Sequence, residues 1–125
     1  MIEFVKNLTF AELELALHDA ALSLENIELK DGVCTLGAYL ERPTRFRAAR
    51  FPMSLEIALT TSFEFDDPER IGQLVVGEIV SDGSVIIFTG PIPGELRIYS
   101  HAQRGRLAVA KEPVQVRRWG RWLPA

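Results

Sequence analysis

The adjacent residues His18 and Asp19 are the side chains in this sequence best suited to chemistry. An aspartate beside a histidine can orient the imidazole for acid–base catalysis, and the two together can bind a metal. His101 is the only other histidine, and no HExxH, H-x-H or Cys-His spacing completes a zinc site. The pair either faces a cleft or forms a polar corner that bonds the backbone of a turn, and the corner is the favoured interpretation. We therefore expect no catalytic residue, no metal and no cofactor.

Cys34 is a nucleophile only if a histidine base lies beside it. It shares the apolar parity of a strand pattern with Leu36, which predicts a buried structural cysteine. As the single cysteine, it also excludes an intrachain disulfide, which suits a reducing compartment. No signal-peptide pattern and no apolar run of membrane-spanning length is present. The sequence thus predicts a cytoplasmic protein without a membrane partner.

The C-terminal segment combines arginine with tryptophan, the residue types that dominate interface hot spots. These candidate binding residues are Arg117, Arg118, Trp119, Arg121 and Trp122. They predict a contact with another protein, or a homo-oligomer formed through the tail. The alternative is that the tail folds back, with Trp119 closing one end of the core.

A second arginine cluster lies between two prolines and is interleaved with Phe46 and Phe51; its members are Arg42, Arg45, Arg47 and Arg50. Such a mixture can bind single-stranded nucleic acid or an acidic protein surface. The sequence pI of about 5.4 argues against nucleic acid, so a solvated connection is the favoured interpretation.

Charge is distributed unevenly along the 125 residues, although the net charge is only −3. Residues 1–41 contain two lysines and eight acidic residues, whereas residues 101–125 contain six basic residues and one glutamate. Either the two ends lie side by side and neutralise each other, or the basic end meets an acidic partner.

The length predicts one domain over residues 1–125, with an irregular tail at 117–125. Thr9 and Glu12 form a capping-box pattern that predicts a short helix over residues 9–18. Asp-Gly dipeptides at 31–32 and 82–83 predict two hairpins. A parity change near Glu25 predicts a β-bulge, and residues 42–52 read as a connection.

Seven or eight strand-like segments follow one another without an intervening helix. Consecutive strands of this kind pair antiparallel. The predicted fold is mainly β, an antiparallel sandwich or open barrel with one short N-terminal helix.

The segment Leu17-His18-Asp19-Ala20, followed by period-two alternation and a turn, resembles a group of small bacterial β-rich domains. That group opens with an "LHDA" element and includes immunity-type proteins from toxin systems and domains of unknown function. The resemblance covers about 30 residues and implies a β-rich fold and binding to another protein. It carries over no catalytic residue.

Three functional hypotheses follow. The first is a non-enzymatic protein-binding domain, with toxin neutralisation as one concrete form. The second is a small-ligand binder or enzyme with His18 and Asp19 at the mouth of a pocket. The third is a nucleic-acid-binding module that uses the two arginine clusters.

Overall fold

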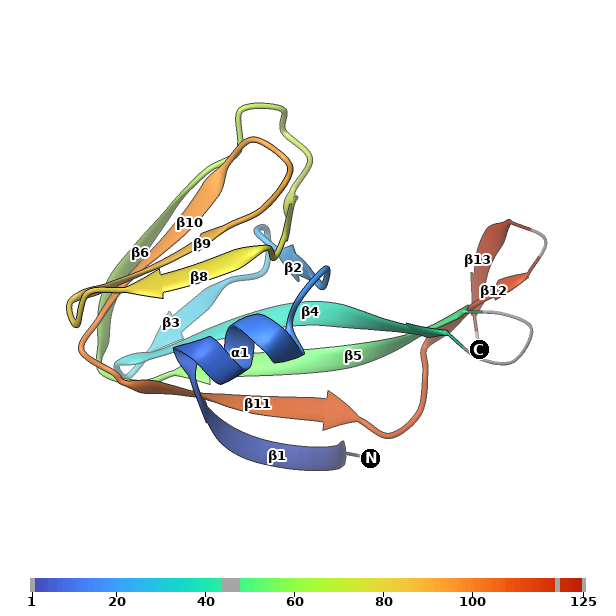
Figure 1. The fold of residues 1–125 in the computed structure, drawn as a ribbon, viewed down its shortest axis with the longest axis horizontal. Coiled ribbons are helices and arrows are strands. Elements are labelled where there is room, and N and C mark those ends of the chain that lie inside the picture. The colour runs from blue at the N-terminus through green and yellow to red at the C-terminus, as the bar shows by residue number, and fades with distance from the viewer. Residues whose placement is uncertain (1, 44–47, 119, 125) are drawn as a thin grey trace.

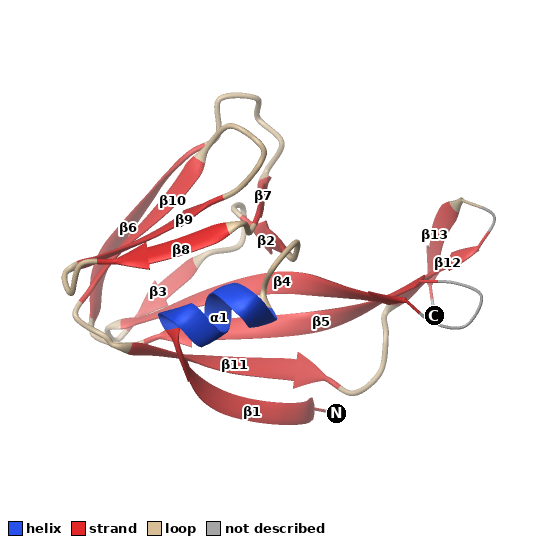
Figure 2. Cartoon of the chain, in the orientation of Figure 1, coloured by secondary structure: helices blue, strands red, loops and turns tan. Residues whose placement is uncertain are grey.

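Two antiparallel sheets face each other across a hydrophobic core, and one short helix lies between them (Figure 1). The structure is a computed structural model that describes residues 2–43, 48–118 and 120–124. Strands make up most of these residues (Figure 2). The predicted mainly β class, with antiparallel pairing and one short helix, is confirmed. No helix in the described part is long and apolar enough to cross a membrane.

The larger sheet contains nine of the described strands. Its main path is β1 (Ile2–Thr9), β11 (Arg104–Ala110), β5 (Ala48–Ile57), β4 (Val33–Pro43), β2 (Ala21–Ser23) and β7 (Gln73–Val75). Beside this path, β3 (Glu28–Lys30) pairs with β4, and β12 (Gln115–Arg118) pairs with β5 and β13 (Arg121–Pro124). The tail predicted to be irregular therefore contains a hairpin that projects from the end of the sheet (Figure 1).

The smaller sheet has the strand order β6 (Thr60–Asp66), β10 (Glu95–Ser100), β9 (Val85–Thr89) and β8 (Glu78–Ser81). Its inner face contributes Ile86, Phe88, Leu96 and Ile98, all fully buried. On the large sheet, directly opposed residues such as Leu36, Leu55 and Leu107 form the facing layer of the core. Because side chains alternate along a strand, the polar members of each strand lie on the two outer faces.

The helix α1 (Phe10–Ala16) follows β1 without a loop. Thr9 and Glu12 form the predicted capping box, with the Glu12 amide donating to Thr9 Oγ1 at 3.2 Å. Leu13 and Leu17 are fully buried between the sheets. Glu14 Oε1 accepts a 2.8 Å hydrogen bond from the Ile79 amide of β8, so a helix side chain satisfies a backbone group on the small sheet.

At one end of the sandwich, the chain crosses between the sheets twice, from β5 to β6 and from β10 to β11. Two buried hydroxyls hold these crossings. Thr60 Oγ1 donates to the Ile57 carbonyl at 2.8 Å, and Ser100 Oγ donates to the Ala58 carbonyl at 2.6 Å. Ser100 Oγ also accepts from the Ala102 amide at 3.0 Å. The two crossings therefore bond to each other as well as to their own turns.

Two further crossings lead from β6 to β7 and from β7 to β8. At the β7–β8 crossing, the Val76 amide donates to the carbonyl of Ala20, the residue before β2 of the large sheet, whereas the Gly77 amide donates to the carbonyl of Thr89 in the small sheet. Gly90 lies directly against the carbonyl of Val75, so closely that a Cβ on Gly90 would overlap its oxygen. Glycine is thus required at position 90 by a close backbone approach.

The predicted Asp-Gly hairpins are both present. Asp31 and Gly32 have φ values of 52° and 76°, the left-handed pair that a tight hairpin requires. In the β8–β9 turn, Asp82 Oδ1 accepts from the amides of Ser84 and Val85 at 2.8 and 2.9 Å. These bonds to the ionised carboxylate lower the pKa of Asp82.

The described residues of the predicted connection over residues 42–52 belong to strands instead, because β4 continues to Pro43 and β5 begins at Ala48. Residues 44–47 lie outside the described part of the chain. The proline at position 52 is tolerated because β5 changes neighbours there. β11 pairs with β5 as far as Met53, and β12 pairs from Arg50, so Pro52 falls between the two ladders. Its missing N–H therefore interrupts neither ladder.

Two further predictions differ from the structure. The bulge expected near Glu25 is a full interruption, because β2 ends at Ser23 and β3 begins at Glu28. Leu59 continues the apolar alternation of Leu55 and Ile57, a pattern that predicts one long strand, yet it is 64% exposed and has a φ of 53° at the β5–β6 crossing. β1 was not predicted, since the pattern that favoured a helix begins immediately after it.

We expect Gly90→Ala to lower the free energy of unfolding by about 3 kcal/mol, because the new methyl group must displace the Val75 backbone. Gly37→Ala is the matched control, since no atom of another residue lies within 4 Å of the place that its new methyl group would occupy on β4. The control should be neutral or stabilising by up to about 1 kcal/mol. Urea unfolding measures both values, and a Gly90→Ala protein as stable as the wild type would contradict the close approach.

Candidate functional site

His18 and Asp19 follow α1, and both side chains are largely exposed, at 65% and 77%. Their Nδ1 and Oδ1 atoms are 3.9 Å apart. The corner is held by its backbone: the Asp19 amide donates to Val76, and the Ala20 amide donates to Leu17. Asp19 has a φ of 64°, which aspartate tolerates better than most residues. The corner is structural, but its two side chains face outward and are available for contact.

Three adjoining hollows lead from this corner across the outer face of the large sheet, and the first two are lined by Asp19. The hollow beside His18 has a volume of about 320 Å³ and shares Asp19 and Glu41 with a second, of about 300 Å³. A third, of about 420 Å³, shares Ala21, Tyr39 and Gln73 with the second. We call this continuous depression the Tyr39 groove.

Strand register explains the groove. Tyr39 of β4 lies opposite Ala21 of β2 and Pro52 of β5, and Gly37 lies opposite Ser54. These small neighbours leave the outer face low around the tyrosine ring, which is 45% exposed. Among the described residues, β2 pairs with β4 only at Ala38 and Tyr39. Beyond Tyr39, β4 has no described neighbour on the β2 side, and the groove continues past this point.

Arg50 connects the groove to the C-terminal hairpin. It lies opposite Glu41 on β4 and opposite Gln115 on β12. Its guanidinium donates to Gln115 Oε1 at 3.2 Å and lies 3.9 Å from the centre of the Trp122 ring. A guanidinium stacked on an indole gains cation–π energy and keeps its fork of donors available at the edge.

The structure thus brings together residues that the sequence analysis treated separately. His18 and Asp19 lie at the Glu41 end of the groove, and Arg50, with Trp122 beside it, lines the hollow that contains Asp19. Trp122 does not belong to the buried core. Trp119 and the side chain of Arg118 lie outside what the structure describes, so the predicted closure of the core by Trp119 stays a prediction.

The arginine cluster of the predicted connection is divided. Arg45, Phe46 and Arg47 lie outside the described residues, and so does the side chain of Arg42. Arg50 belongs to the groove, whereas Phe51 packs against the core and is not part of an exposed stacking platform.

Tyr39 was missed as a site residue by the sequence analysis, and Arg50 was assigned to an arginine cluster on a solvated connection. The available signal for Tyr39 was an aromatic residue on the polar parity of a strand, where exposed aromatics mark contact sites. No signal in the sequence placed Arg50 at this groove, because its partners Gln115 and Trp122 are 65 or more positions away in the chain.

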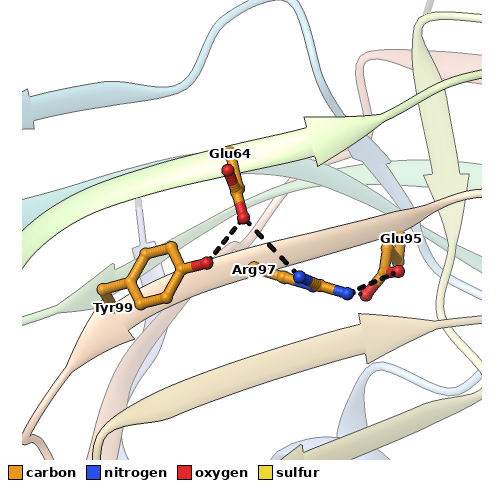
Figure 3. Close-up of polar contacts among 4 residues, drawn as sticks. All are labelled: Glu64, Glu95, Arg97 and Tyr99. Carbon is orange, nitrogen blue, oxygen red and sulfur yellow. Dashed lines mark hydrogen bonds and ion pairs between the residues drawn. The ribbon is translucent and has the colours of Figure 1, made fainter.

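A polar network occupies the outer face of the small sheet (Figure 3). Tyr99 Oη donates to Glu64 Oε1 at 2.5 Å, and Arg97 donates to both oxygens of Glu95 at 2.8 and 3.1 Å. The bond to Glu64 raises the pKa of Tyr99, whereas the Arg97 guanidinium lowers the pKa of Glu95. The four side chains therefore bond to one another, and the network stabilises the ionised form of Glu95 and the protonated form of Tyr99.

The fold brings some of the acidic residues near the N-terminus beside basic residues near the C-terminus. β1 and β11 are neighbours, and Arg104 lies 3.9 Å from Glu12, so the two ends of the chain do lie side by side there. Arg117 and Arg121 on the hairpin are exposed and make no ion pair with any described residue. Within the described ranges, no cluster of three His, Cys, Asp or Glu side chains is placed to hold a metal.

Cys34 is fully buried on the inner face of β4, and burial raises the pKa of its thiol to about 11. The native thiol should therefore resist an aromatic disulfide reagent at pH 8 and react at once when the chain is unfolded in guanidinium. The raised pKa also means that the native state loses stability as the pH rises above about 9, because the unfolded chain ionises first. Fast labelling of the native protein at pH 8 would show that Cys34 is accessible.

Comparison with known proteins gives no relative to set beside this geometry. No family model, no curated protein and no solved structure matches the chain. The resemblance of Leu17-His18-Asp19-Ala20 to small immunity-type domains therefore stays a prediction. The residues themselves define the candidate site, which is the Tyr39 groove with the Arg50–Trp122 contact at its end.

Proposed function

We propose that this protein is a non-enzymatic binding domain whose Tyr39 groove receives an extended segment of another protein. The observation that supports this most strongly is the composition of the groove. An exposed tyrosine and an arginine stacked on tryptophan line one continuous depression. Tyrosine, tryptophan and arginine are the side chains that contribute most to protein–protein affinity.

The shape of the groove also favours a polypeptide. It follows β4 from Gly37 to Glu41, a distance of about 13 Å at the usual rise per strand residue. Beyond Tyr39, β4 has no described neighbour on the β2 side, so an incoming strand can use backbone bonds as well as side-chain contacts. Main-chain pairing would provide affinity, and the Tyr39 and Arg50 side chains would provide selectivity.

The mixed charge of the groove supports a protein rather than a nucleic acid. Asp19 and Glu41 accompany the single guanidinium of Arg50. Two carboxylates beside one arginine repel a phosphate backbone but complement a segment that carries both signs of charge. Neutralisation of a toxin is one concrete form of this function, in keeping with the resemblance at Leu17-His18-Asp19-Ala20.

A small-ligand site at the His18 end of the groove is the second candidate. The hollow of about 320 Å³ there combines the apolar Leu40 and Ala48 with His18, Asp19 and Glu41. A ligand held there would depend on His18 but not on Tyr39 or Arg50, whereas a protein segment along the groove would depend on Tyr39 and Arg50 as well.

We expect affinity capture from extracts of the source cell to retain one discrete protein on the wild-type chain. Tyr39→Ala should weaken its binding at least tenfold, because truncating a central aromatic residue of an interface commonly costs about 2 kcal/mol. Tyr99→Ala is the matched control, since Tyr99 lies on an outer face of the other sheet and should leave binding unchanged. Titration calorimetry with the purified partner gives the affinities.

The same measurement separates the two candidates. A bound small molecule that is lost only in His18→Ala would favour the ligand site. Recovery of the free chain alone, even after crosslinking, or equal binding by Tyr39→Ala and the wild type, would contradict the proposed function.

A further inference from the structure

The strand β6 forms an edge of the small sheet, because within the described chain it pairs only with β10 (Figure 1). Its register with β10 is unbroken from Ser62 to Asp66. The seven residues of β6 include no proline, lysine or arginine. A long, regular edge of this kind presents a row of backbone donors and acceptors to any strand that approaches it.

Strand alternation shows which backbone groups of β6 face outward. The Ser100 amide donates to the Ser84 carbonyl, in continuation of the ladder between β10 and β9. Alternate residues of an antiparallel strand bond to opposite neighbours, so the backbone groups of Arg97 bond to β6 instead. Arg97 lies opposite Glu64, whose backbone groups therefore face β10. The N–H and C=O groups of the two phenylalanines that flank Glu64 consequently face away from the sheet.

The side chains of Phe63 and Phe65 extend the hydrophobic face of the small sheet to this edge. They lie opposite Ile98 and Leu96, whose side chains are fully buried in the core. Phe63 packs against that core, whereas Phe65 is 46% exposed. An apolar ring on the core-facing parity is thus left open to solvent beside outward-facing backbone groups.

Other edges of the two sheets are protected against an added strand. On β1, the register is broken between Ile2 and Phe4, and Lys6 lies opposite the buried Leu107 and so places a charge on the core-facing parity. Along β8, the helix α1 covers the edge, because a glutamate of α1 accepts the hydrogen bond of the Ile79 amide. The edge strands β3 and β7 are only three residues long. β6 has none of these protections.

We propose that β6 pairs antiparallel with β6 of a second copy, so that the small sheets of two chains become one continuous sheet. A two-fold axis perpendicular to the sheet relates the copies, which makes the contact isologous and closes it at a dimer. The axis keeps the core-facing sides of both small sheets on the same side. A second copy therefore offers what this edge requires, which is a strand with outward-facing backbone groups and phenylalanines on the matching face.

Backbone direction and charge select the register centred on Phe63. There Phe63 lies opposite its own copy and exchanges two hydrogen bonds with it, and both carboxylates of β6 lie opposite hydroxyl side chains. A register centred on Glu64 would oppose two Glu64 carboxylates, and one centred on Phe65 would oppose Glu64 to Asp66. Like charges in directly opposed positions destabilise a sheet. A register centred on Ser62 would carry Phe65 past the end of the partner strand.

The selected register also covers the exposed ring. Phe65 lies diagonally from Phe63 of the second copy on the same face, a separation that aromatic side chains can bridge. The dimer leaves the Tyr39 groove open, because that groove lies on the outer face of the large sheet. The association therefore does not depend on the function proposed for the groove.

Sedimentation velocity over a range of protein concentrations tests this association. We expect the average mass to rise with concentration and to level off at twice the monomer mass, because a two-fold contact closes. Phe65→Lys should weaken the dimer by about tenfold or more, since it places a charge on the core-facing parity of the edge. Val80→Lys is the matched control, because Val80 is 49% exposed on β8, the opposite edge of the same sheet.

The control should dimerise as the wild type does, and urea midpoints close to the wild-type value establish that both variants are folded. A wild-type chain that stays monomeric at every concentration overturns the proposal. Growth beyond a dimer, or a Phe65→Lys chain that dimerises at wild-type strength, overturns it as well.

Disulfide crosslinking tests the register. Ser62 of one copy and Glu64 of the other should form a non-hydrogen-bonded pair with Cα atoms about 4.5 Å apart, within the span of a disulfide. A mixture of Ser62→Cys chains and Glu64→Cys chains should therefore form a covalent dimer under mild oxidation. Each chain alone should link poorly, because identical positions are diagonal and about 7 to 8 Å apart. The native Cys34 is fully buried.

A mixture of Ser62→Cys with Asp66→Cys is the matched control, since these positions are directly opposed only in the register centred on Glu64. Non-reducing electrophoresis measures the covalent dimer in each mixture. Linking in the first mixture that is no stronger than in the control mixture overturns the proposal.

Discussion

The buried hydroxyls of Thr60 and Ser100 are the contacts on which the rest of the structure depends. A chain that passes from one sheet to the other must turn at the edge of the core, where a backbone N–H or C=O without a hydrogen bond is costly. Ser100 Oγ donates to Ala58 and accepts from Ala102, so one side chain ties the β5–β6 crossing to the β10–β11 crossing. Thr60 closes its own turn through Ile57. With Gly77 and Gly90 at the β7–β8 crossing, these contacts fix the relative position of the two sheets.

The outer faces are free to function because the inner faces are fully used. Leucine, isoleucine and phenylalanine side chains from both sheets and from α1 fill the core. The outward-facing side chains are not constrained by packing in the core. On the large sheet they include an exposed tyrosine and an arginine stacked on tryptophan. On the small sheet they include opposed carboxylates. Neither arrangement belongs to the buried core, and the one on the large sheet forms the Tyr39 groove that is proposed as a binding surface.

Local patterns predicted the parts of the fold that depend on near neighbours. The Thr9–Glu12 capping box, the Asp31-Gly32 hairpin and the buried parity of Cys34 and Leu36 each involve contacts within a few residues. The crossings could not be predicted, because Leu59 continues an apolar alternation that only the corner interrupts. The groove could not be predicted either. Its lining includes pairs as distant in the chain as Arg50 and Gln115. Pro52 by itself indicates a loop, and only the change of neighbour from β11 to β12 along β5 explains why a strand can contain it.

The central claim is that the crossings make the two sheets one unit and thereby hold the Tyr39 groove in shape before any partner binds. Native-state amide hydrogen exchange tests this most directly, by comparing the amides of β4 and β5 with those of β9 and β10. The account predicts that the slowest amides of both sheets exchange with the same free energy, equal to that of global unfolding measured in urea. A small sheet that opens at a much lower free energy, while β4 and β5 stay protected, would contradict it.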